Sequence, residues 1–350
     1  MKKLNLTKAS RRNFLTYGVV ILAFLILQGL ASAGAMSSML KGLLVPICAY
    51  VVMAISLNLT VGVLGELSLG HAGFMSVGAF TGVSAALVLQ DLVASNELRL
   101  LCALVVGAVF AGVVGFLVGI PVLRLNGDYL AIVTLAFGEI IKSVFNNLYF
   151  GLDANGFHLS LLNNRLNMEP DGRLIIGGPM GIGGIRKIAN FPTGFVLILI
   201  CLIIIFNLVN SRAGRAIMAI RDNRIAAESV GIPITRYKMM AFVTSAAMAG
   251  AAGALFALNF STVVANKFDF NTSILVLVFV VLGGLGNMMG SIVAAAALTA
   301  LPEALRQFAD YRMLVYAIVL ILVMLIRNNP TIRGFFARFR PGRKEEEANG

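Results

Sequence analysis

The chain has 350 residues, of which 59% are apolar and only 13% are charged, and its mean hydropathy is +0.90. Soluble domains carry about 25% charged residues, and one soluble core cannot bury this much apolar surface, so the composition excludes an ordinary soluble protein. A bilayer takes up roughly 20 apolar residues per helical crossing, and we therefore expect an all-α polytopic membrane protein.

The net charge of +12 comes mainly from three short polar segments, which hold 17 of the 28 Lys and Arg residues. These segments are residues 1–12, 211–238 and 327–350. Cytoplasmic loops of membrane proteins collect Lys and Arg, so the clustering predicts that all three lie in the cytoplasm and argues against binding of nucleic acid. Two His residues are too few for a multi-histidine metal centre, and we expect no metal site.

The sequence contains about ten apolar segments. If the chain starts in the cytoplasm and each segment crosses the membrane once, the sixth and the tenth segments both end in the cytoplasm, beside the second and third basic segments. The segments are residues 13–33, 43–64, 73–90, 100–123, 129–150, 193–210, 239–260, 272–285, 288–304 and 312–326. The first is longer than the apolar region of a secretory signal, so we expect an uncleaved span. The predicted parts are a cytoplasmic N-terminal segment (1–12), a transmembrane domain (13–327) with a periplasmic loop (151–192) and a cytoplasmic loop (211–238), and a cytoplasmic tail (328–350).

Two glycine-rich stretches interrupt the apolar pattern. Residues 272–304 hold two apolar runs, each too short for a comfortable crossing, and the strings VGVLGELSLG (61–70) and LGGLGNMMGS (282–291) are similar. Paired interrupted helices in two halves of a chain indicate a transport pathway, so we predict half-helices and an internal repeat, with chance similarity as the alternative. The predicted half-helix breaks are Gly65, Gly283, Gly284 and Gly286.

The second basic segment also has a helical pattern. The composition of residues 215–230 predicts a short amphipathic helix beneath the membrane, which Gly231 ends. A loop that only sets orientation explains the basic residues. It does not explain the small Ala226 and Ala227 beside Glu228, which would allow a partner protein to approach closely.

Three blocks of the sequence carry a family resemblance, and a fourth is a lesser match. They are LNLTVGVLGELSLGHAGFMSVGAFTG (57–82), GDYLAIVTLAFGEIIKSVFNN (127–147), the basic loop continuing into MMAFVTSAAMAGAAGALFA (239–257), and GGLGNMMGSIVAAA (283–296). They resemble the permease subunits of bacterial ABC importers for branched-chain amino acids. The outer loop ends in GGPMGIGGI (177–185), which looks like an element of the larger of the two paired permeases, with Met180 where Asn or Asp is usual.

This resemblance implies a heteromeric complex in the bacterial inner membrane. Its other members would be a second homologous permease subunit, two ABC ATPase subunits on the cytoplasmic side and a periplasmic substrate-binding protein. The chain contains no Gly-Lys dipeptide and hence no Walker phosphate loop, so we expect a transporter subunit that is no enzyme and holds no cofactor, with ATP and Mg bound by the ATPase subunits. The resemblance places the ATPase-coupling surface on Arg221, Asp222, Ala226, Ala227, Glu228 and Gly231.

Polar side chains within the apolar segments are candidates for a translocation path. An intramembrane carboxylate is costly, which favours a path or gate role for Glu66, and the alternative is a position near the cytoplasmic interface. The uncharged candidates could equally hydrogen-bond neighbouring helices. Glu139 can pair with Lys142 three residues later, which would lower the burial cost of both. The predicted path residues are Asn58, Glu66, Ser68, His71, Thr134 and Glu139.

The resemblance implies import of branched-chain, aliphatic amino acids by alternating access. Urea, short amides or other amino acids are alternative cargoes within the same family. A passive channel for small solutes and a structural scaffold are alternatives of another class. A zwitterion with an apolar side chain needs a largely apolar path with a few hydrogen-bonding groups, so we expect high affinity to reside in the binding protein.

Overall fold

The computed structural model describes residues 8–34, 36–90, 92–125, 127–153, 156–161 and 172–305, together with residues 317, 318 and 321. The chain divides into two compact units, residues 1–296 and 297–350. The tenth predicted segment, 312–326, lies outside the described residues apart from three positions, and the predicted tail lies wholly outside them.

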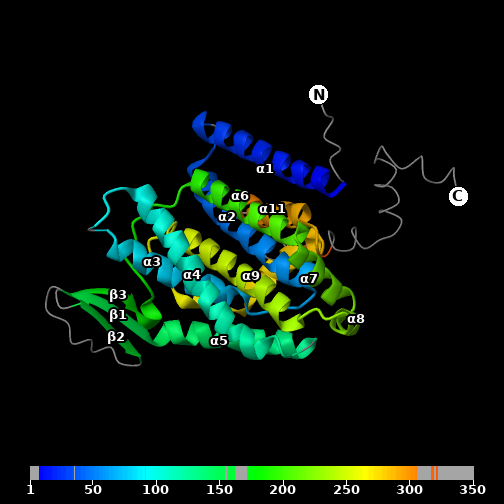
Figure 1. The fold of residues 1–350 in the computed structure, drawn as a ribbon. Coiled ribbons are helices and arrows are strands. Elements are labelled where there is room, and N and C mark those ends of the chain that lie inside the picture. Colours follow the sequence, from blue (N-terminus) through cyan, green and yellow to red (C-terminus); the bar gives the residue numbers. More distant parts are fainter. Residues whose placement is uncertain are drawn as a thin grey trace. The chain divides into compact units, whose positions relative to one another are not determined.

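The described residues contain eleven α-helices and one small sheet (Figure 1). The helices are α1 (Lys8–Ser32), α2 (Ser38–Asn58), α3 (His71–Val88), α4 (Asn96–Val122), α5 (Asp128–Asn147), α6 (Phe191–Asn210), α7 (Arg212–Asp222), α8 (Arg224–Ser229), α9 (Ile234–Ala257), α10 (Phe270–Gly283) and α11 (Met288–Ala304). A π-helix, η1 (Leu59–Leu64), continues α2, and two 3-10 turns are η2 (Gly178–Met180) and η3 (Ala265–Lys267).

Seven helical stretches among the described residues are long and apolar enough to cross a membrane, which confirms the prediction of an all-α polytopic membrane protein. They comprise α1, α2 with η1, α3, α4, α6, α9, and η3 with α10. Helix α11, with 17 residues, is a shorter apolar helix. Helix α5 forms where the segment 129–150 was predicted, but it ends at Asn147 because the chain there turns into a strand.

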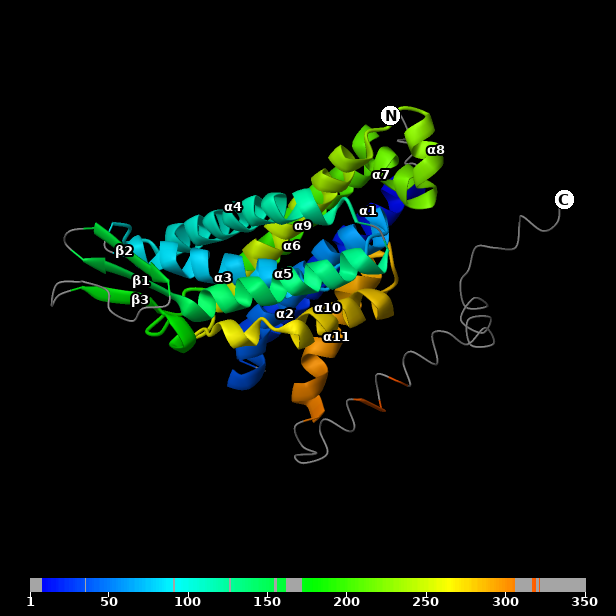
Figure 2. The same ribbon diagram turned by 90° about the horizontal axis from the view of Figure 1, so that it is seen from below.

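Helices α3, α4 and α9 pack side by side in the first unit (Figures 1 and 2). Their contacts depend on residues without a side chain: a Cβ on Gly78 would lie 1.9 Å from the carbonyl oxygen of Gly250, and a Cβ on Gly250 would lie 2.4 Å from that of Gly107. Membrane helices gain van der Waals energy and no hydrophobic energy from one another, so close approach of their backbones is what holds them together.

The two glycine-rich stretches both interrupt helices, and they lie against each other. Helix η1 ends at Gly65, whose φ is 82°, and helix α10 ends at Gly283 before a short turn in which Gly284 and Gly286 have φ of 102° and 76°. A Cβ on Gly62 would lie 2.2 Å from the backbone nitrogen of Gly286. Gly65 and Gly286, which the comparison of the two strings aligns, thus share a left-handed conformation that favours glycine.

The predicted outer loop contains a three-stranded antiparallel sheet that the sequence analysis did not predict. Its strands are β1 (Leu148–Asp153), β2 (Gly156–Leu161) and β3 (Arg173–Gly177), in the order β2-β1-β3. The sheet follows α5 directly, since Leu148 already has extended backbone angles. In Figure 2 the sheet and the α7–α8 pair lie at opposite ends of the helices, so the two loops extend from opposite sides of the membrane-spanning part.

Candidate translocation and coupling sites

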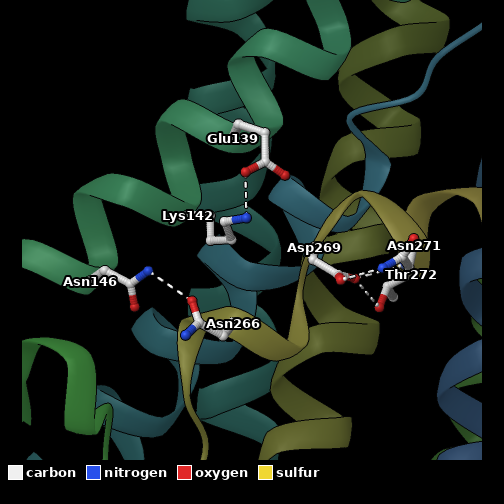
Figure 3. A network of polar contacts seen from close by, with 7 residues as sticks. All are labelled: Glu139, Lys142, Asn146, Asn266, Asp269, Asn271 and Thr272. Atoms are coloured by element: carbon white, nitrogen blue, oxygen red, sulfur yellow. Dashed lines mark hydrogen bonds and ion pairs between the residues drawn. The ribbon is translucent and has the colours of Figure 1, made fainter.

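Helix α5 carries a polar strip formed by Glu139, Lys142 and Asn146 (Figure 3). Glu139 and Lys142 form an ion pair, as their spacing predicted. Asn146 donates a hydrogen bond of 2.9 Å from Nδ2 to Oδ1 of Asn266. The side chains of Lys142 and Glu139 are 22% and 43% exposed, so this charged pair lies at the surface of the chain.

A small open pocket lies beside Glu139, where α5 approaches the starts of α3 and α10. Its polar lining consists of Glu139, Asp269 and Ser273. Asp269 begins α10, and its Oδ1 accepts a 2.9 Å hydrogen bond from the backbone nitrogen of Thr272 (Figure 3). The pocket therefore combines two carboxylates and a hydroxyl with an apolar wall. That wall is formed by Leu69, Leu135, Phe268 and Phe270.

Three of the predicted path residues are buried near the start of α3. Thr134 accepts a 3.1 Å hydrogen bond from the backbone nitrogen of Leu69, and Nε2 of His71 lies 2.8 Å from Oγ of Ser56. The hydroxyl of Ser68 is buried with no hydrogen-bond partner among the described residues. The contacts of Thr134 and His71 are those of helix packing, the alternative that the sequence left open.

Asn58 connects the two interrupted stretches. Its Oδ1 accepts a 2.8 Å hydrogen bond from the backbone nitrogen of Gly286, and its Nδ2 donates to Oγ of Ser291 at 2.8 Å and to the carbonyl oxygen of Gly284 at 3.5 Å. Asn58 is fully buried, so these bonds form away from water and fix η1 against the turn before α11.

Glu66 lies at the break between η1 and α3, and it forms an ion pair with Lys238 in the second turn of α9. The side chains of Lys238 and Glu66 are 2% and 14% exposed. This carboxylate is therefore neutralised within the chain, at the end of the second span. The path or gate role of Glu66 and its alternative, a position near the cytoplasmic interface, both stay predictions.

The single amphipathic helix predicted over residues 215–230 is wrong, because two helices occupy this range. Helix α7 ends at Asp222, and Asn223 has extended backbone angles and accepts a 3.0 Å hydrogen bond from the backbone nitrogen of Ala226. An Asn that caps a new helix in this way is a known start signal, and it separates α8 from α7. The segment ends at Gly231 as expected, with φ of 82°.

The predicted coupling residues face in two directions. Asp222, Ala226, Glu228 and Gly231 are exposed. The structure corrects the prediction that Ala227 lies on the coupling surface. Ala227 is 4% exposed and packs with Ile220 and Ile234, so it holds α8 to its neighbours and offers no surface to a partner.

Arg221 also turns toward its own chain. It donates from Nη1 to the carbonyl oxygen of Gly62 at 3.1 Å and pairs with Asp222. The exposed apolar residues of this region are Ile225 and Val230, at 81% and 74% exposure, both on or beside α8. The surface that α8 offers to a partner therefore consists of Ile225, Val230 and the exposed coupling residues.

Sequence reasoning missed Lys238 and Asp269. Lys238 was counted only as one of the basic residues of the loop, and nothing in the sequence connects it to Glu66, 172 positions away. Asp269 had a readable signal, because Asp three residues before Thr272 at the start of an apolar run is typical of a helix N-terminus.

Comparison with known proteins gives a family match over most of the chain. Residues 39–324 match the model of the family described as the permease component of the branched-chain amino acid transport system. Two proteins named high-affinity branched-chain amino acid transport system permease protein LivM, from Salmonella typhimurium and Escherichia coli, are each 35% identical over 288 residues, 79% of this chain and 66% of theirs. The chain thus spans slightly less than two thirds of the length of these relatives.

More distant relatives differ in their named cargo. The Autoinducer 2 import system permease protein LsrC of an Enterobacter strain is 24% identical over 313 residues, covering 81% of this chain and 90% of that protein. A probable LivM protein of Methanocaldococcus jannaschii is 26% identical over 278 residues, covering 69% of this chain and 74% of that protein. No solved structure matches the chain.

Proposed function

Because the chain belongs to the family of permease components of branched-chain amino acid transport systems, we propose that it is the membrane permease subunit of an ABC importer that moves branched-chain, aliphatic amino acids into the cytoplasm. Transport proceeds by alternating access, and separate ATPase subunits bind ATP and Mg and supply the energy. The names of the relatives at 35% identity support this cargo. The more distant LsrC, named for a different cargo, is the reason to test the cargo directly.

The observation that carries the proposal is the exposed ion pair of Glu139 and Lys142 on a helix of a membrane protein. A charged side chain that faces lipid at the centre of the bilayer costs about 3 kcal/mol or more. The exposed side of α4 is apolar instead, as Leu101 and Val109 illustrate with exposures of 59% and 58%. We therefore assign α4 to the lipid and the polar strip of α5 to a water-filled path shared with a second homologous permease subunit.

The chemistry of this strip suits a zwitterion. Glu139 can accept the ammonium group of an amino acid and Lys142 can donate to its carboxylate, while the nearby Leu135 and Phe270 offer apolar contact to an aliphatic side chain. Each new contact replaces part of the existing ion pair, so binding in the path stays weak. High affinity then resides in the periplasmic substrate-binding protein, and the cargo is released rather than trapped.

The two ends of the molecule receive different partners. The basic segment with α7 and α8 faces the cytoplasm under the rule that Lys and Arg collect inside, and both termini lie on that side. The sheet at the opposite end then faces the periplasm and the binding protein. Ile225 and Val230 are exposed apolar residues on either side of Glu228 in the sequence, and such exposed residues suit contact with a groove of the ATPase subunit.

Uptake by the complete complex in cells without their own branched-chain importers tests the cargo. We expect uptake of labelled leucine that is inhibited by an excess of isoleucine or valine. An excess of urea or acetamide should not inhibit this uptake. Competition by urea or acetamide would favour the alternative cargoes of the same family. Reversing the charges within residues 221–228 should abolish uptake by an importer and leave a passive channel conducting.

A further inference from the structure

Two contacts attach the flanks of helix α8 to one short break in the helices. Before α8, Arg221 at the end of α7 donates to the carbonyl oxygen of Gly62 at 3.1 Å. After α8, Lys238 in α9 forms its ion pair with Glu66. Gly62 and Glu66 stand on either side of Gly65, where η1 ends before α3 begins.

The Arg221 contact satisfies a backbone group that the break leaves open. The last carbonyl groups of a helix lack partners within the helix, and the C-terminal end carries partial negative charge, so a guanidinium there is favourable. The side chain of Arg221 also packs on Gly65, since a Cβ at Gly65 would lie 2.5 Å from Cγ of Arg221. Gly65 is thus needed both for its φ of 82° and for the space that Arg221 fills.

The Glu66–Lys238 contact resists separation because both side chains are largely buried, at 14% and 2% exposure. Removing one partner of a buried ion pair leaves an uncompensated charge, whereas an exposed pair opens at little cost. A movement of the start of α9 therefore moves Glu66 with it. Arg221 is a second charged side chain that contacts the break.

The break passes such a movement on to the second interrupted stretch. Gly62 lies against Gly286, and Asn58 holds Gly286 and Ser291 by hydrogen bonds of 2.8 Å. A displacement of residues 62–66 thus reaches α10 and the start of α11 through direct contacts.

We propose that Arg221, Glu66 and Lys238 are positioning residues that form a two-point link, consisting of the Arg221–Gly62 and Glu66–Lys238 contacts, between α8 and the interrupted helices. When a partner ATPase moves α8, the link displaces the break at Gly65 and with it the turn at Gly286. This inference rests on the proposed function, because it requires an ATPase that acts on α8.

The test compares leucine transported per ATP hydrolysed in proteoliposomes that contain the complete complex and its binding protein. The variants are Glu66→Gln, Lys238→Met and the charge-exchanged pair Glu66→Lys with Lys238→Glu. Arg236→Met is the matched control, since Arg236 is exposed and lies two residues from Lys238 on the same helix. Copurification of the ATPase subunits reports on assembly.

Both single variants should keep the assembled complex and its ATP hydrolysis but lower leucine moved per ATP by about tenfold, a usual size for coupling between sites. The control should retain the original ratio, and the charge-exchanged pair should recover a large part of it. If the complex with the exchanged pair does not assemble, Lys238→Arg takes its place. This variant keeps the positive charge and should retain the original amount of leucine transported per ATP hydrolysed. An unchanged ratio in the single variants, or a parallel loss of assembly, hydrolysis and uptake, would overturn the two-point link. Absence of ATP-driven uptake by the unmodified complex would overturn the proposed function itself.

Discussion

Neutralising the Glu139–Lys142 pair should slow leucine transport far more than it destabilises the protein. With exposures of 43% and 22%, the pair resembles surface ion pairs, which contribute at most about 1 kcal/mol to stability. A charged group that contacts cargo in a path contributes about 1.5–3 kcal/mol through its hydrogen bond. Because 1.4 kcal/mol corresponds to a factor of ten, the variants should transport roughly ten to one hundred times more slowly.

The assay measures initial rates of labelled leucine uptake by complexes that carry Glu139→Gln, Lys142→Met or both changes. Thermal unfolding of each purified complex gives the stability. Lys41→Met removes an exposed positive charge from the start of α2 and serves as the control, with unchanged rates expected.

Two results would refute this reasoning. Uptake at the original rate by the double variant would show that the path does not pass the polar strip of α5. A loss of stability large enough to account for the whole loss of transport would show that the pair is only structural, against the small contribution expected from its exposure.

Three further changes test the fold and the coupling surface. Gly250→Val should cost about 1–3 kcal/mol and lower the unfolding temperature because its side chain would overlap α4, whereas Gly42→Val, with nothing within 4 Å, should not. Asn58→Leu should cost about 2 kcal/mol by leaving the backbone nitrogen of Gly286 unpaired, and an unchanged unfolding temperature would contradict this. Ile225→Asp should weaken copurification of the ATPase roughly tenfold without loss of folded protein, since Ile225 is 81% exposed; retention of the ATPase would exclude Ile225 from the interface.

Features set by local chemistry could be predicted from the sequence. The break after α10 follows from the glycines at 283, 284 and 286, and the Glu139–Lys142 pair follows from a spacing of three on one helix. The boundary at Asn223 was missed although its signal is local. The helical composition on both sides concealed a capping Asn.

Features set by distant contacts could not be predicted in this way. Glu66 and Lys238 meet only after α9 has packed on the π-helix, and no sequence pattern relates positions so far apart. The sheet depends on antiparallel pairing of β1 with both β2 and β3. Only β2, GFHLSL, alternates apolar and polar residues, whereas LYFGLD in β1 and RLIIG in β3 do not, so the sequence signal for the sheet is confined to one short strand. Ala227 shows the same limit, because a small residue suits both a partner's approach and the packing with Ile220 and Ile234 that it makes.

Accumulation of labelled leucine by proteoliposomes with the complete complex and its binding protein tests the central claim most directly. An importer driven by a separate ATPase should concentrate leucine on the side that carries the ATPase, above the leucine concentration on the side that carries the binding protein. This accumulation should require ATP and Mg and should stop when the ATPase is inhibited. Because the cytoplasmic side carries the ATPase, the account predicts that leucine accumulates on the same side as α8. Equal leucine concentrations on both sides, reached without ATP, would contradict the account and identify a passive channel.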